Sequence, residues 1–201
     1  LAHFFWQGEM YNGSPAKMVS TDLGATVGSI ELASKGIVSR GILVDVPMVR
    51  GADWLERGEG VMPQDILDAE ERCGFTIESG DILLIRTGQL YRRNVEGPVN
   101  PREKGSSGCH VACLPLLYSR DVAVLGSDTG NDIIPSMYPA LTSPIHQVGM
   151  VAMGMWILDN VDLEELSDTC RRLNRWEFML TTGPLRLHNT TGSPVNPTAI
   201  F

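Results

Sequence analysis

The sequence has few of the features that mark membrane, secreted or nucleic-acid-binding proteins. No apolar run approaches the roughly 20 residues that a transmembrane helix needs. Four cysteines in 201 residues are too sparse for a disulfide framework, and we interpret Cys109 and Cys113 as small buried hydrophobic residues. The 16 Lys and Arg residues form no cluster, and the net charge is −8. We therefore expect a cytoplasmic protein with reduced thiols and neither a membrane nor a nucleic-acid partner.

Two further absences bear on chemistry. The chain contains no Gly-x-Ser-x-Gly elbow, which argues against hydrolysis by a serine nucleophile. It also has no initiator Met, and it opens on Leu1-Ala2-His3-Phe4-Phe5-Trp6, a His within an apolar and aromatic run. Such a run is typical of a buried strand or loop. We expect a fragment whose upstream residues carried part of the chemistry; the alternatives are a processed N-terminus or an edited sequence.

Gly and Pro divide the chain into short segments that alternate between strand-like and helix-like patterns. The pattern predicts strands over 37–46, 81–88, 121–126, 155–158, 176–182 and 185–187, and helices over 63–73, 111–118, 144–154 and 164–173. Residues 94–108 are rich in Pro, Gly, Ser and charge, which predicts a mobile loop. This alternation favours an α/β fold or a mixed, β-rich relative, and the length allows one domain or two.

Polar residues gather where the predicted buried strands end, at Arg86-Thr87, Ser127-Asp128 and Asp159. In α/β proteins, ligands usually bind at the carboxyl ends of the strands. His146 lies near the start of an apolar helix, and Asp159 follows the next strand, so the chain can bring the two together. An imidazole and a carboxylate suit a divalent ion. Alternatively, Asp159 only begins a polar turn.

The other candidates are less specific. His3 and His110 each have a structural alternative, as a core residue and as a helix cap or packing residue respectively, and we expect His188 on the surface. The segment from Ser127 to Asp132 could orient a ligand, a water or a metal-bound His. It could equally be a simple turn, because Asx side chains cap and Gly bends the chain.

Taken in order, these segments resemble the metal-dependent cyclase family, which includes bacterial kynurenine formamidase and isatin hydrolase. That family carries the motif His-x-x-x-His-x-Asp-x-x-x-His, and Leu1-Ala2-His3 matches its tail, with His3 as the last His. The resemblance also covers residues 7–13, 35–43, 80–88, 126–128, 146–163 and 192–197.

The resemblance implies a swivelling β/β/α fold with a mixed β-sheet core and packed helices, as one cyclase-like domain over 1–201 that lacks its N-terminal part. His3 would be the catalytic acid or base. His146 and Asp159 would bind a divalent metal, Zn²⁺ or Mn²⁺, with Asp159 where Glu is usual. The other motif ligands would precede Leu1, so the fragment alone should be inactive. Side chains that would contact substrate or support the ligands are Phe4, Phe5, Trp6, His110 and Asp128.

The implied reaction is hydrolysis of a carbon–nitrogen bond in a formamide or cyclic amide by metal-activated water. The kynurenine formamidase resemblance would place it in tryptophan catabolism, and family relatives suggest a homodimer or homotetramer that acts on a small molecule. Two alternatives stay open: a non-catalytic scaffold with an incomplete metal site, and a hydrolase of a lactone or other cyclic ester.

Overall fold

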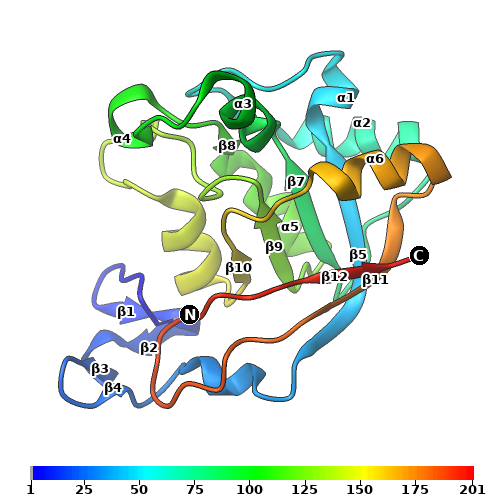
Figure 1. Ribbon diagram of the computed structural model, residues 1–201. Coiled ribbons are helices and arrows are strands. Elements are labelled where there is room, and N and C mark those ends of the chain that lie inside the picture. Colours follow the sequence, from blue (N-terminus) through cyan, green and yellow to red (C-terminus); the bar gives the residue numbers. More distant parts are fainter. Residues whose placement is uncertain (1) are drawn as a thin grey trace.

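The computed structural model describes residues 2–201, and its centre is a six-stranded sheet with the order β10-β9-β7-β5-β11-β12 (Figure 1). The strands of this sheet are β5 (Ile37–Asp45), β7 (Ile82–Arg86), β9 (Val124–Ser127), β10 (Trp156–Leu158), β11 (Glu177–Thr182) and β12 (Thr198–Ile200). The first four in spatial order run parallel, whereas β11 and β12 are antiparallel to their neighbours. The predicted α/β class with a mixed sheet is confirmed.

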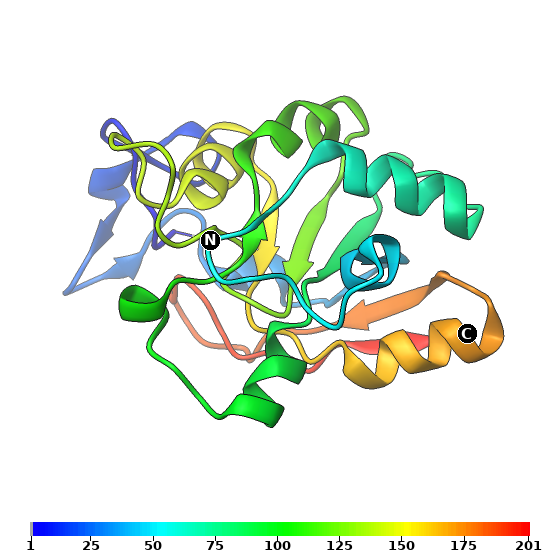
Figure 2. The ribbon, with the colours of Figure 1, turned by 90° about the horizontal axis from the view of Figure 1, so that it is seen from above.

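The central strands are buried on both faces, as their continuous apolar sequences predict. Every residue of β7 and β9 is buried. Helices α2 (Pro63–Cys73) and α5 (Leu114–Ser119) cover one face, and α6 (Glu164–Leu173) lies against the other (Figure 2). Because β10, β9, β7 and β5 run parallel, their carboxyl ends meet at one edge of the sheet.

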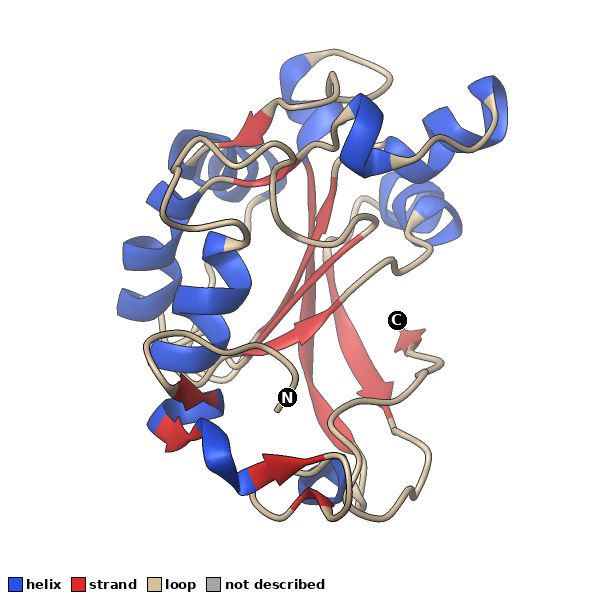
Figure 3. Cartoon of the chain, turned by 90° about the vertical axis from the view of Figure 1, so that its left-hand side faces the viewer, coloured by secondary structure: helices blue, strands red, loops and turns tan. Residues whose placement is uncertain are grey.

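Smaller elements surround this centre. The further helices are α1 (Val46–Arg50), α3 (Gln89–Glu96), α4 (Pro101–Lys104), a π-helix over Ile145–Ala152 and 3₁₀ turns at Tyr11–Gly13, Ala16–Met18, Ile30–Ala33 and Val111–Cys113. The short strand pairs are β1 (Glu9–Met10) with β2 (Ser14–Pro15), β3 (Val19–Ser20) with β4 (Gly24–Ala25), and β6 (Gly60–Val61) with β8 (Gly108–Cys109). The pairs β1–β2 and β3–β4 lie at one end of the large sheet and do not extend it (Figure 3).

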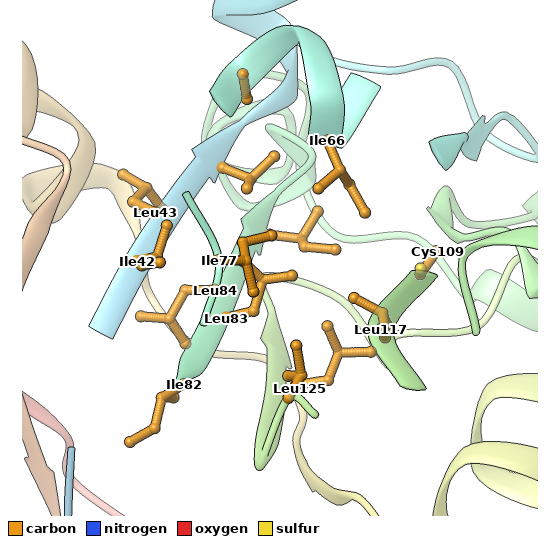
Figure 4. Packing of buried hydrophobic residues seen from close by; sticks show 14 of the residues in the cluster. Ile42, Leu43, Ile66, Ile77, Ile82, Leu83, Leu84, Cys109, Leu117 and Leu125 are labelled. Atoms are coloured by element: carbon orange, nitrogen blue, oxygen red, sulfur yellow. The ribbon is translucent and has the colours of Figure 1, made fainter. Parts of the chain in front are cut away.

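The main core fills both faces of the sheet and includes residues of the helices α2, α5 and α6 (Figure 4). Leu43, Leu84 and Leu125 from three neighbouring strands are almost fully buried, together with Ile66 of α2 and Leu117 of α5. Burying a side chain of this size stabilises the fold by roughly 1.5–3 kcal/mol. This packing makes the sheet a rigid support for the residues at its carboxyl edge.

Local signals account for α2, which has the bounds that the sequence predicts. Pro63 takes the first helical position, and the Asp65 carboxylate accepts a hydrogen bond from the Met62 N–H at 2.6 Å. Gly74 ends the helix with φ +73°, a left-handed conformation that favours glycine.

Two local predictions were wrong. Residues 185–187 form no strand, because Leu185 and Leu187 are exposed and β11 pairs with β12 instead. The predicted loop 94–108 contains α4. The predicted helix over 144–154 is present over Ile145–Ala152 as a π-helix, a wider form that often occurs at functional sites. No helix within residues 2–201 combines the length and apolarity needed to cross a membrane.

Candidate functional site

His146 is the centre of the candidate site. It lies in the first turn of the π-helix and is only 3% exposed. Its Nδ1 is 2.6 Å from Oδ2 of Asp132, and Oδ1 of the same carboxylate accepts the Ile145 N–H at 2.6 Å. Asp132 therefore holds both the start of the helix and the imidazole ring.

Asp159 comes to the other side of the same ring. It directly follows β10, which pairs with β9 in parallel, so it stands at the carboxyl edge of the sheet. Its Oδ2 is 3.2 Å from Nε2 of His146, and its Oδ1 accepts a hydrogen bond from Asn131 Nδ2 at 2.8 Å. The structure thus brings together the imidazole and the carboxylate that the sequence singles out as a pair.

The N-terminal segment completes this cluster. The rings of His3 and His146 are 6.5 Å apart between centroids, in an edge-on arrangement. The ring of the adjacent residue Phe4 stacks on His146 at 4.1 Å with an interplanar angle of 27°. Phe5, by contrast, is 46% exposed, and Trp6 forms a backbone bridge with Glu9.

The charges around His146 shift three pKa values. Burial alone would lower the pKa of His146, but its hydrogen bonds to Asp132 and Asp159 outweigh this and raise it to about 9. Burial would raise the pKa of Asp159, but the interaction with His146 lowers it. His3 is partly exposed. Desolvation of its imidazole and the charge of His146 both lower the pKa of His3. The two carboxylates therefore create a position that favours a cation.

A cavity of about 850 Å³ lies beside this cluster. His3 and Asp159 contribute to its wall, together with apolar side chains that include Trp156, Ile157 and Val161. Polar residues such as Asn160, Asp162 and Ser193 also line it. Clefts of this size that mix apolar and polar walls are common small-molecule sites.

The remaining polar residues at the strand ends have partners within the protein. Arg86 pairs with Asp45 at 3.1 Å and with Glu164 at 2.8 Å. Asp128 accepts hydrogen bonds from both the N–H and the hydroxyl of Thr87, each at 2.8 Å, and its burial raises its pKa. These contacts tie neighbouring strands and α6 together, away from the ring of His146.

His110 acts as a helix cap, one of the roles that the sequence allows. Its Nδ1 accepts a hydrogen bond from the Ala112 N–H at 3.1 Å, and its ring lies 6.0 Å from that of Tyr138. Sequence reasoning left open whether the segment with Asn131 and Asp132 was a simple turn. The two Asx residues after a buried strand were the available signal, but only the folded chain shows which side chains they contact.

The family model for cyclases, described as "Putative cyclase", matches residues 2–131, which is more than half of the chain. The chain belongs to the Cyclase family. No curated protein matches the chain.

Solved structures agree with this family. The chain superposes along its whole length on 66% of a structure described as a novel cyclase, with a TM-score of 0.86 and 26% identity. For isatin hydrolase A from Ralstonia solanacearum, the TM-score is 0.65 at 18% identity, over 86% of this chain and 64% of that one. For a potential metal-dependent hydrolase with cyclase activity, the TM-score is 0.58 at 16% identity, over 96% and 77%. The chain thus spans just under two thirds of the length of the first two.

The residues of this cyclase chain fit part of a divalent-ion site. A metal-binding His commonly donates its other ring N–H to a carboxylate, and the contact between His146 and Asp132 has this form. Nε2 of His146 and the carboxylate of Asp159 are donors that Zn²⁺ and Mn²⁺ accept. Within residues 2–201, no three His, Cys, Asp or Glu side chains converge to hold an ion. The described residues therefore offer two ligands of such a site.

Proposed function

We propose that this member of the Cyclase family is a metal-dependent hydrolase that cleaves the carbon–nitrogen bond of a formamide or cyclic amide, and that the described residues form part of its active site. One observation carries the proposal: His146 is held at Nδ1 by Asp132 and faces Asp159 through Nε2, with His3 close by and a cavity of about 850 Å³ alongside. Two relatives support it by name, an isatin hydrolase and a potential metal-dependent hydrolase.

The roles follow from the positions of the groups. Nε2 of His146 and the carboxylate of Asp159 would hold the ion. A bound Zn²⁺ or Mn²⁺ supplies a polarised carbonyl and a water of lowered pKa. The His3 imidazole, whose centroid is 6.5 Å from that of His146, would accept the proton of the attacking water and return it to the leaving nitrogen.

The cavity and the stacked Phe4 suit a flat, partly apolar substrate. Phe4 covers one face of His146, so it closes one approach to the candidate ligands. Trp156 and Ile157 line the adjoining cavity, where the acyl or aryl part of a substrate would lie. A lactone would present a similar ring and carbonyl, and it remains the second candidate substrate.

Variants of three His residues in the full-length protein test these roles. His146→Ala should lower the content of Zn²⁺ or Mn²⁺. His3→Ala should keep the metal and slow turnover by about 10²–10⁴-fold, the usual loss for a general acid or base. His188→Ala is the matched control: its side chain is 82% exposed and pairs with Glu31, so metal and turnover should stay unchanged.

The assay would compare isatin, an aryl formamide and an aryl lactone. Faster turnover of the amides supports the proposal, and faster turnover of the lactone favours the second candidate. If His3→Ala leaves turnover unchanged, the acid–base assignment is wrong. A full-length protein that binds neither Zn²⁺ nor Mn²⁺ would instead indicate a non-catalytic relative.

We also propose that residues 1–201 belong to one cyclase-like domain and that the protein forms a cytoplasmic homodimer or homotetramer. The partly exposed aromatic run at Phe4, Phe5 and Trp6 would suit a subunit interface. Light scattering of the full-length protein would give the mass of the assembly, and a monomer would contradict the proposal.

A further inference from the structure

One short turn contacts both candidate metal ligands. Asn131 is fully buried with φ +59°, and its Nδ2 donates to Oδ1 of Asp159 at 2.8 Å and to the Leu158 carbonyl at 3.0 Å. Asp132, 4% exposed, receives the ring of His146 at 2.6 Å. Two consecutive side chains therefore reach two different elements, the strand β10 and the π-helix.

The turn itself is held in place by β8. The Asn131 carbonyl accepts the Cys109 N–H at 2.7 Å, and Cys109 forms a parallel bridge with Asp132. A Cβ atom at Gly108 would lie 2.6 Å from the Asn131 carbonyl oxygen and 2.5 Å from the Asp132 carbonyl carbon. Only glycine lets β8 approach this closely, so the backbone of the turn has little room to move.

We propose that Asn131 and Asp132 are positioning residues that set the orientation of the two candidate ligands; this rests on the function proposed above. The Asp132 carboxylate fixes the rotation of the His146 ring and occupies Nδ1, so that Nε2 is the nitrogen that faces Asp159 and the proposed ion position. The Asn131 amide donates a hydrogen bond to Oδ1 of Asp159, so that Oδ2 is the oxygen that faces His146. The pair would thus decide which atoms of His146 and Asp159 are available to hold an ion.

A role in the turn alone is the competing explanation. A turn residue of this kind usually bonds to backbone groups within two or three positions. Asn131 instead reaches Leu158 and Asp159, 27 and 28 positions away, and Asp132 reaches His146, 14 positions away. Two of these three contacts end on the candidate ligands, and the third ends on the backbone next to one of them.

The test measures Zn²⁺ affinity and the visible absorption of bound Co²⁺ in the full-length protein. Asp132→Asn removes the charge beside His146, and Asn131→Gly removes the amide while tolerating the positive φ. Each should weaken Zn²⁺ binding by about 10–100-fold and change the Co²⁺ spectrum, as expected for groups that orient ligands. Because the two variants break separate contacts, each tests the inference independently.

Asp81→Asn is the matched control. Asp81 is also a buried carboxylate, paired with Arg40 at 2.7 Å, but it precedes β7 and therefore lies at the opposite edge of the sheet. It should lower stability and leave Zn²⁺ affinity and the Co²⁺ spectrum unchanged.

The outcomes separate this inference from the proposed function. If His146→Ala does not weaken Zn²⁺ binding, the proposed metal site fails, and the inference fails with it. If His146→Ala weakens binding while Asp132→Asn and Asn131→Gly leave both affinity and spectrum as in the unaltered protein, the metal site stands and the positioning role is overturned. Equal loss of affinity in Asp81→Asn would also overturn it, since general destabilisation would then explain the effect.

Discussion

Asp45 is the best place to test how charge holds the sheet edge together. It ends β5, is 1% exposed, and accepts hydrogen bonds from Arg86 at 3.1 Å, Ser167 at 2.5 Å and Arg171 at 2.7 Å. Ser167 and Arg171 belong to α6, and Arg86 to β7. One buried carboxylate thus joins two strands and a helix.

Asp45→Asn keeps the size of the side chain and removes its charge. Breaking a buried ion pair from one side usually costs about 3–5 kcal/mol, because the partner charge stays buried. Arg86 keeps its two hydrogen bonds to Glu164, at 3.0 and 2.8 Å, so we expect the lower end of that range, about 3 kcal/mol.

Urea unfolding at pH 7 measures this cost as a change in the free energy of unfolding. Glu177→Gln is the control: its ion pair with Arg40 is also short, at 2.8 Å, but the two side chains are 39% and 31% exposed. Exposed pairs contribute about 0–1 kcal/mol. If Asp45→Asn costs no more than Glu177→Gln, the buried network does not stabilise the fold as argued.

The same pair of proteins gives a pH prediction. Burial would raise the pKa of Asp45, but Arg86, Ser167 and Arg171 lower it below its usual value. A carboxyl with a lowered pKa contributes its stability fully above its unfolded value of about 3.9 and loses it as pH falls through the folded pKa. The difference in unfolding free energy between the unaltered protein and Asp45→Asn should therefore stay constant above about pH 4 and shrink below it. A difference that already shrinks between pH 7 and pH 5 would contradict this account.

Three further outcomes are expected. Gly41→Ala should destabilise the fold by about 1–3 kcal/mol in urea unfolding, because its Cβ would lie 2.4 Å from the ring of Phe178; an unchanged midpoint would refute this overlap. Tyr11→Phe removes the acceptor of the Trp156 indole N–H, now at 2.6 Å, and should cost about 1 kcal/mol in the same assay, whereas no loss would show that water replaces the contact. Adding EDTA to the Zn²⁺-loaded full-length protein should stop turnover, and Zn²⁺ or Mn²⁺ should restore it; turnover that persists would argue against a metal-dependent reaction.

Much of the fold could be predicted from local sequence. The helix 63–73 has its start signal at Pro63 and its stop signal at the next residue, Gly74, and the apolar runs of β7 and β9 mark buried strands wherever they pair. The final strand could not be predicted from local sequence, because the segment with Leu185 and Leu187 has the better strand pattern. The strand Thr198–Ile200 forms only because it pairs with β11, an earlier strand of the chain.

The candidate site divides in the same way. The sequence by itself singled out His146 and Asp159 as a possible pair, because a helix followed by a returning strand brings the start of the helix near the end of the strand; the contact itself is seen only in the structure. The sequence could not show whether Asn131 and Asp132 form a simple turn or contact Asp159 and His146, and it gave no sign that Phe4 stacks on His146. Those contacts join residues from 14 to more than 140 positions apart. Only the packing of β8, β10 and the π-helix around one edge of the sheet brings their side chains within hydrogen-bonding or stacking distance.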